Sequence, residues 1–220
     1  MTVNSGDTAF QKGYSFKSSE LSCAHDYLLP ALTQLVEQER QKRAVKTLPL
    51  FDLGCGNGSV ANYLAQLGYQ VTGVDPSEDG INMAKTAYPE LNLQPGSTDE
   101  NLAGRFGQFP VVYSLEVIEH VYSARKFAAC TFNLLEPGGT AIVSTPYHGY
   151  FKNLAIALVN GFDEHFKAIW DHGHIKFWSM RTLSTLLSQA GFVNVRFVRV
   201  GRIPPLARSM IAVAEKPGQV

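Results

Sequence analysis

The fold of this chain is decided by residues 48–58, which read LPLFDLGCGNG. A short apolar run leads into the alternating glycines Gly54, Gly56 and Gly58, and apolar residues then recur at helical spacing as far as Leu67. This pattern predicts a strand, a tight turn and a helix. Glycines in such a turn let the backbone approach a ligand closely, and the free N–H groups of the helix N-terminus attract one. The segment therefore predicts a ligand-binding loop.

The flanking sequence continues with alternating strand and helix patterns. Residues 70–74 form the predicted second strand, which ends at Asp75 and Pro76, a pair that turns the chain. Further strands are predicted at 92–94, 111–113 and 140–144, and helices at 27–36, 79–87, 123–135 and 179–191. Two closing strands are expected at 193–200, with a bulge at Val198, and at 209–214. This alternation predicts an α/β protein with a mostly parallel sheet and helices on both faces.

Composition narrows the class of protein. The chain has 220 residues, of which 45% are hydrophobic, enough for the core of one domain. Its 19 basic residues balance 19 acidic ones, so no nucleic-acid partner is expected. The 3 cysteines are far apart and fit reduced thiols, and the N-terminal sequence lacks the apolar run of a signal peptide. Since no apolar stretch is long enough to span a bilayer, we expect a cytoplasmic protein.

The carboxylate after the second strand indicates which ligand the loop binds. Asp75 lies beyond Asp52 at the end of the next strand, where a carboxylate accepts both hydrogen bonds of a ribose diol. The glycine spacing is GxGxG, and Ser59 stands where dinucleotide-binding loops have their third glycine. This difference argues against NAD, and a ligand that carries adenosine is predicted.

Four stretches, taken in order, resemble class I S-adenosylmethionine-dependent methyltransferases. They read FDLGCGNG at 51–58, VDPS at 74–77, SLEVIEHV at 114–121 and LLEPGG at 134–139. The resemblance covers residues 48–216 and is nearest to the ubiquinone-biosynthesis type of O-methyltransferase. It implies a Rossmann-like fold with an antiparallel hairpin at one sheet edge. We expect one methyltransferase domain over 1–220, with an N-terminal arm and helix at 1–46, a cofactor-binding core at 47–146, an inserted lid at 147–178, and a closing helix and edge strands at 179–220.

The same resemblance implies that the cofactor is S-adenosylmethionine, and it assigns residues to the parts of that molecule. Asp52 and the glycines would hold the amino-acid end, Asp75 the ribose, and residues 97–99 the adenine, while Ser114 and Leu115 would line the methionine portion. The full set of predicted cofactor-binding residues is Asp52, Gly54, Cys55, Gly56, Asn57, Gly58, Asp75, Pro76, Ser77, Ser97, Thr98, Ser114 and Leu115.

The acceptor side of the reaction needs positioning and at most one proton acceptor, because the sulfonium is already a good leaving centre. His148 and Tyr147 are the candidates for that base, since they follow the strand at 140–144, where the active-site crevice of a parallel sheet lies. The alternative interpretation is that both are lid residues hydrogen-bonded to backbone.

A divalent metal site is a second hypothesis for the acceptor side. Glu116, Glu119 and His120 have the spacing that puts three side chains on one face if the segment is helical. Downstream, Asp171, His172 and His174 would complete such a site, an arrangement that resembles the metal-dependent small-RNA 2′-O-methyltransferases. The predicted ligands are Glu116, Glu119, His120 and His174. The competing interpretation is that the Glu and His residues support the site without any metal, as in many members of the family.

The lid at 147–178 is too rich in apolar and aromatic residues for an ordinary solvated loop. It is predicted to cover an apolar or aromatic acceptor. Core packing of a helical cap is an equally open interpretation, and peripheral contact with a membrane, which the resemblance to quinone enzymes implies, is a third. Arg199, Arg202 and Arg208 flank Pro204 and Pro205 and either bind an acidic group or form a solvated edge.

The predicted function is therefore S-adenosylmethionine-dependent O-methylation of a small aromatic or quinol-like hydroxylated acceptor. Alternatives are an N-methyltransferase, an RNA 2′-O-methyltransferase, and a module that binds S-adenosylmethionine without catalysis. Neither the acceptor, the methylated atom nor the oligomeric state follows from the sequence.

Overall fold

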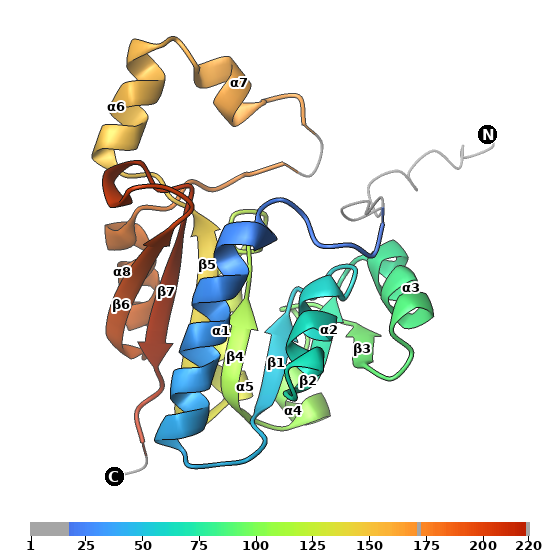
Figure 1. The fold of residues 1–220 in the computed structure, drawn as a ribbon. Coiled ribbons are helices and arrows are strands. Elements are labelled where there is room, and N and C mark those ends of the chain that lie inside the picture. Colours follow the sequence, from blue (N-terminus) through green and yellow to red (C-terminus); the bar gives the residue numbers. More distant parts are fainter. Residues whose placement is uncertain (1–17, 171–172, 219–220) are drawn as a thin grey trace, which may run out of the picture.

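A seven-stranded sheet forms the centre of the molecule (Figure 1). The structure is a computed structural model that describes residues 18–170 and 173–218. The strand order is β3-β2-β1-β4-β5-β7-β6, and β7 runs antiparallel to both of its neighbours while the other pairs are parallel. The strands are β1 (Pro49–Leu53), β2 (Gln70–Asp75), β3 (Asn92–Pro95), β4 (Phe109–Ser114), β5 (Leu135–Pro146), β6 (Val193–Val200) and β7 (Ser209–Glu215). The predicted α/β class, with its antiparallel edge pair, is confirmed.

Helices cover both faces of this sheet. On one face lie α1 (His25–Lys42), α2 (Ser59–Gln66) and α3 (Glu78–Ala87), and on the other lie α4 (Leu102–Phe106), α5 (Ala124–Leu134) and α8 (Met180–Gln189). Successive strand residues feed the two faces alternately, so that Leu50 packs in the cluster under α1 and Phe51 in the cluster under α5. Burial on both faces explains why the central strands read as continuous apolar runs.

Side-chain caps fix where several helices begin. The Ser77 hydroxyl accepts a hydrogen bond from the Gly80 N–H at 3.1 Å and starts α3 directly after β2. Ser123 caps α5 in the same way, and Ser179 and Thr182 form a reciprocal capping box at the start of α8. These local signals keep the turns between strands and helices short, which fixes the residues that face the carboxyl edge of the sheet.

The topology gathers the chemically interesting segments at one edge. The strand order reverses between β1 and β4, and the carboxyl ends of parallel strands at such a switch point form a crevice. The glycine loop follows β1, Asp75 ends β2, and the turn at 115–121 follows β4. These segments therefore open toward the same crevice, with the lid above it.

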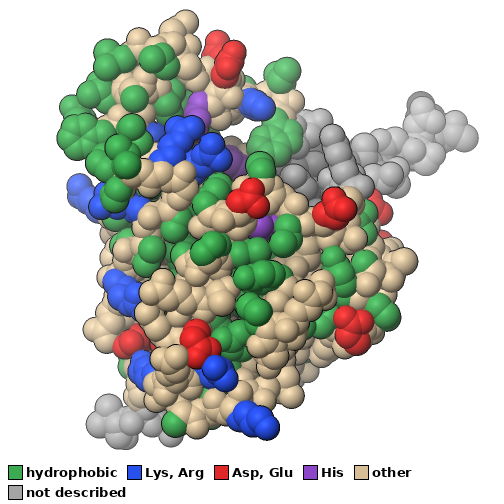
Figure 2. All heavy atoms as spheres, viewed as in Figure 1, with side chains coloured by type: hydrophobic (Ala, Val, Ile, Leu, Met, Phe, Trp, Pro, Cys, Tyr) green, Lys and Arg blue, Asp and Glu red, His purple; other side chains and the backbone are tan. Residues whose placement is uncertain are grey.

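The lid consists of two short helices, α6 (Tyr150–Leu158) and α7 (Phe162–Phe166), that stand above the carboxyl edge (Figure 1). Neither helix contains a buried residue. Figure 2 shows the hydrophobic side chains of this region gathered on the outer surface; the exposed ones are Tyr150, Phe151, Leu154, Leu158, Val159, Phe162, Ile169 and Trp170. None of the described helices is both long and apolar enough to cross a membrane.

Some boundaries differ from the sequence-based expectations. β5 begins at Leu135 instead of residue 140, because Leu135 pairs with Phe109 and a register shift before Val111 absorbs the extra residues. The irregularity in β6 lies between Val193 and Arg196, not at Val198. Asn194 adopts a positive φ of 53° there, which removes the residue from regular pairing. The short helix α4 and the 3-10 helix η2 (Pro204–Leu206) were not anticipated.

Candidate active site

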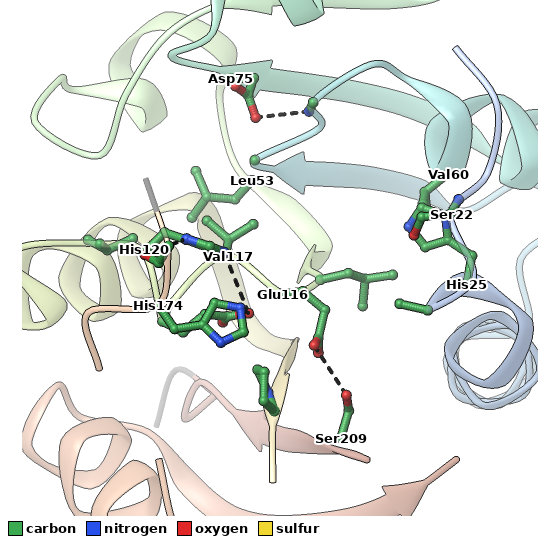
Figure 3. Close-up of a pocket in the computed structure, with 18 of the residues that line it drawn as sticks. Ser22, His25, Leu53, Val60, Asp75, Glu116, Val117, His120, His174 and Ser209 are labelled. Carbon is green, nitrogen blue, oxygen red and sulfur yellow. Dashed lines mark hydrogen bonds and ion pairs between the residues drawn. The ribbon is translucent and has the colours of Figure 1, made fainter. Parts of the chain in front are cut away.

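A cavity of about 1340 Å³ runs along the carboxyl edge of the sheet. The glycine loop, Asp75 and residues 96–99 line the part where the cofactor is expected. Lid residues line the part where the acceptor is expected, together with Arg202, Leu206, Arg208 and Ser209. Cavities for one drug-sized ligand measure about 300–1,000 Å³, so this one has room for a cofactor and a second molecule. Figure 3 shows Asp75 on one side of the cavity and His120 and His174 on the other.

The glycine loop is held in a shape that only glycine adopts easily. Gly54 has a φ of 93°, and a Cβ at this position would lie 2.5 Å from a methyl carbon of Val117. Gly58, the residue before α2, has a φ of 77°, and its Cβ would meet Leu93 at 2.7 Å. The Val74 carbonyl accepts hydrogen bonds from the N–H groups of Gly54 and Cys55, which fastens the loop to β2. The loop is therefore preorganised for close approach of a ligand.

Asp75 joins the loop to the second strand. One carboxylate oxygen accepts a hydrogen bond from the Gly56 N–H at 2.9 Å, and the other accepts from the Ser77 N–H at 2.8 Å. Burial raises the pKa of Asp75, and these two backbone donors act in the opposite direction. Each carboxylate oxygen has a second lone pair, so the group can accept ribose hydroxyls as well.

Asp52 is buried beneath the loop. The Tyr113 hydroxyl donates to its carboxylate at 2.8 Å. Burial raises the pKa of Asp52 to about 8, while the bond from Tyr113 lowers it. Because burial disfavours the ionised form of this carboxylate, a cationic partner would stabilise it, and the ammonium group of a methionine moiety has that charge.

An N-terminal segment that the sequence analysis did not assign to the site also closes over the loop. The Asn57 side-chain amide donates to the carbonyls of Ser18 and Glu20, at 2.7 and 3.2 Å, and the Tyr88 hydroxyl donates to the Ser19 carbonyl. Further along, Glu20, Ser22 and His25 line the cavity. Nothing in the local sequence indicated this contact, because it depends on how the chain before α1 returns across α2 and α3.

Most of the expected cofactor residues lie at the cavity wall. Those that line it are Asp52, Gly54, Cys55, Gly56, Asn57, Asp75, Pro76, Ser77, Ser97, Thr98 and Leu115. Gly58 and Ser114 do not line it. Gly58 serves the turn into α2, and the Ser114 hydroxyl donates to the Leu53 carbonyl, which ties β4 to β1. Ser114 thus holds the two central strands together beneath the site.

The segment at 115–121 is a turn, which corrects the helical arrangement considered for Glu116, Glu119 and His120. Glu116 has a positive φ of 54° and its side chain points away from the histidines, toward Ser209 (Figure 3). Its carboxylate accepts hydrogen bonds from the hydroxyls of Ser144 at 2.8 Å and Ser209 at 3.2 Å. Burial raises the pKa of Glu116 to about 7. The structure therefore separates Glu116 from the other three predicted metal ligands.

Glu119, His120 and His174 come together as a cluster whose ligand atoms all lie within 4.8 Å of one another. The Glu119 Oε1 atom lies 3.9 Å from His120 Nε2 and 4.0 Å from His174 Nε2. Glu119 is 1% exposed, and this oxygen has no hydrogen-bond partner among the described residues, whereas Oε2 accepts from the Thr145 hydroxyl. The predicted Asp171 and His172 fall outside the described residues.

The chemical state of the cluster suits a cation. The Gly173 carbonyl lies 3.1 Å from His120 Nδ1, so this nitrogen donates, and Nε2 is the ring nitrogen near Glu119. Burial, with His120 nearby, lowers the pKa of His174 to about 4, which keeps that ring neutral. Burial and Glu116 raise the pKa of Glu119 well above its usual range. Two imidazole rings and a buried carboxylate oxygen are ligand types that fit a divalent metal.

The two candidate bases lie outside the cavity lining. His148 is buried among aromatic rings of the lid, 5.8 Å between centroids from Phe166 and 5.2 Å from Phe177. Burial lowers the pKa of His148 to about 4. Tyr147 is buried as well, with the Arg199 guanidinium over its ring at 5.9 Å. The structure thus brings neither side chain to the wall where an acceptor would react.

Comparison with known proteins identifies the family. A family model described as a methyltransferase domain matches residues 24–196, more than half of the chain. Two relatives are ubiquinone biosynthesis O-methyltransferases. The one from Caulobacter sp. (strain K31) is 36% identical over 59% of this chain and 52% of the relative. The one from Mesorhizobium japonicum is 31% identical over 68% of this chain and 60% of the relative. The chain spans about half the length of the first of these relatives.

Solved structures with the same fold have low sequence identity. A methyltransferase from Methanosarcina mazei superposes with a TM-score of 0.59 at 18% identity, covering 80% of this chain and 95% of that one. The DszA carbon methyltransferase superposes with a TM-score of 0.60 at 17% identity, covering 84% of this chain and 52% of that one. The chain belongs to the methyltransferase domain family and has the class I fold, for which S-adenosylmethionine is the cofactor.

Proposed function

We propose that this member of the methyltransferase family transfers a methyl group from S-adenosylmethionine to a hydroxyl of a small aromatic or quinol-like acceptor. The observation that carries the proposal is the shared cavity, in which the glycine loop and Asp75 face the Glu119, His120 and His174 cluster. The likeness to ubiquinone biosynthesis O-methyltransferases supports a hydroxylated ring as the acceptor. Apolar lid residues at the acceptor end, Ala155, Ile156 and Val159, suit such a ring.

In the proposed reaction the acceptor hydroxyl gives its proton to solvent water, and its oxygen attacks the methyl carbon in line with the carbon–sulfur bond. That bond breaks, its electron pair passes to sulfur, and S-adenosylhomocysteine leaves. The chain contributes chiefly by alignment: Asp75 and the loop fix the nucleoside, and Leu115 and Val117 line the same cavity. Because His148 is buried away from the cavity, we assign no proton transfer to it.

A divalent cation bound by Glu119, His120 and His174 is part of the proposal. Such an ion would supply a positive charge that lowers the pKa of an acceptor hydroxyl beside it. Two features favour this charge: Glu119 Oε1, which has no hydrogen-bond partner within residues 18–170 and 173–218, and the His120 ring, which the Gly173 carbonyl orients. Glu116, whose carboxylate is occupied by Ser144 and Ser209, is not one of the proposed ligands.

The test is a turnover screen with S-adenosylmethionine and catechols, simple phenols or anilines, in which S-adenosylhomocysteine and the methylated product are measured by mass spectrometry. We expect methyl ethers of catechols. Products from anilines alone would instead make the protein an N-methyltransferase. Cofactor binding without product from any acceptor would support a non-catalytic module.

The contribution of a metal is tested in the same assay. Prior dialysis against EDTA is expected to abolish turnover while leaving the affinity for S-adenosylhomocysteine unchanged, and added Mg²⁺, Mn²⁺ or Zn²⁺ should restore activity. Full turnover in EDTA would exclude the metal from the proposal and leave alignment as the source of catalysis.

A further inference from the structure

Three basic side chains meet at the acceptor end of the cavity, beneath the lid. Lys152 belongs to α6, and Arg202 and Arg208 lie on either side of η2. Figure 2 shows Lys and Arg side chains gathered between the hydrophobic lid and the body of the protein. The tertiary fold thus brings cations from separate segments to one wall of the cavity.

These cations form no ion pair with an acidic side chain in the part of the chain that the structure describes. The Lys152 ammonium donates to the Arg208 backbone carbonyl at 3.3 Å, and the Arg208 guanidinium lies 5.7 Å from the centre of the Tyr27 ring. The Glu116 carboxylate acts on Lys152 only through space, since Ser144 and Ser209 take up its hydrogen bonds.

The electrostatics of the cluster favour an added negative charge. Burial lowers the pKa of Lys152 to about 8; Glu116 raises it, and Arg202 lowers it again. Like charges held together in a partly desolvated cavity destabilise one another until a counterion joins them. Carboxylates and phosphates are the groups that a guanidinium binds through paired hydrogen bonds.

We infer that the methyl acceptor carries an anionic group, a carboxylate or a phosphate, which Lys152, Arg202 and Arg208 bind while its apolar body packs under α6. The inference rests on the proposed function and narrows its substrate class. An acidic group at this wall anchors the acceptor by the end away from the glycine loop. The reacting hydroxyl is then free to face the Glu119, His120 and His174 cluster. Ala155, Ile156 and Val159 supply the apolar surface next to the charges.

The test compares acceptors that differ only in charge. Titration calorimetry with the S-adenosylhomocysteine complex would measure the binding of 3,4-dihydroxybenzoate, its neutral amide and 3,4-dihydroxybenzylphosphonate. We expect the anions to bind about 10- to 100-fold more tightly than the amide. The ranking of carboxylate and phosphonate then identifies the source of the charge. Lys152→Met combined with Arg202→Met should abolish the preference, whereas Arg181→Met, on exposed α8 surface outside the cavity, should keep it.

The outcomes separate this inference from the proposed function. Equal binding of amide and anions, or no binding of any of them, would overturn the inference. Weakened S-adenosylhomocysteine binding in the double variant would overturn it too, because the cations would then belong to the cofactor carboxylate. Equal methylation of amide and benzoate would refute the inference and leave the proposed function intact. Preferential binding of the anions without methylation of any acceptor would refute the proposed function and leave the anion-binding site intact.

Discussion

Replacement of Asp75 by alanine tests the assignment of the cofactor end. The carboxylate accepts hydrogen bonds from Gly56 and Ser77 at 2.9 and 2.8 Å, and it lines the cavity where a ribose would lie. The hydrogen bonds from Gly56 and Ser77 form with or without ligand, so their loss in the variant chiefly disorders the loop. The hydrogen bonds from the ribose diol form only in the complex, so their loss directly weakens binding. Hydrogen bonds to a charged group contribute about 1.5–3 kcal/mol each, and partial replacement by water leaves about 2–4 kcal/mol in total.

That loss corresponds to about a 30- to 1,000-fold weaker affinity for S-adenosylmethionine and S-adenosylhomocysteine. Titration calorimetry measures it, with circular dichroism melting to establish that the variant is folded. Asp75→Asn, which keeps one oxygen acceptor, should fall between the wild type and Asp75→Ala. Asp79→Asn, exposed in the first turn of α3, should bind normally. A folded Asp75→Ala protein whose affinity stays within about threefold of wild type would refute the placement of the ribose.

Three further predictions concern the loop, the metal and pH. Gly58→Ala should lower the free energy of unfolding by about 2–4 kcal/mol in urea denaturation, since its Cβ would meet Leu93 at 2.7 Å at a φ of 77°. Gly68→Ala, with a φ of 89° but open space around it, should cost less, and equal losses would contradict the steric argument. His174→Ala should remove Mn²⁺ binding in calorimetry, and undiminished binding would place the metal elsewhere. Because burial lowers the pKa of Lys152 to about 8, its positive charge is lost as pH rises through that value. The KM for an anionic acceptor should therefore rise between pH 7 and 9, and Lys152→Arg should flatten this profile.

Local sequence patterns were sufficient for most of the architecture. The apolar run before Gly54 predicted β1, and the caps at Ser77, Ser123 and Ser179 lie where helices begin. Each of these signals acts within one turn or one strand, so it survives in the sequence without knowledge of the partners. Periodicity failed where pairing between strands overrode it, as in β6, whose irregularity follows from its register against β7.

Local sequence patterns predicted only part of the candidate site. Asp75 and the glycine loop could be found because they belong to a short strand–turn–helix–strand unit. Glu116 was expected beside Glu119 and His120, but a turn with a positive φ directs its carboxylate to Ser144 and Ser209 instead. No spacing rule foresees this, since the hydroxyls that attract the carboxylate come from β5 and β7.

The sequence by itself determined the fold class, the family and the cofactor loop, because these depend on residues that are neighbours along the chain. Only the tertiary structure decided several meetings of distant residues: Glu116 beside Ser209, the segment before α1 across Asn57, and Lys152 with Arg202 under the lid. Those meetings depend on strand order and on the packing of the lid over the sheet edge. Burial then shifts the pKa values of the ionisable residues among them, and no local sequence pattern predicts that burial.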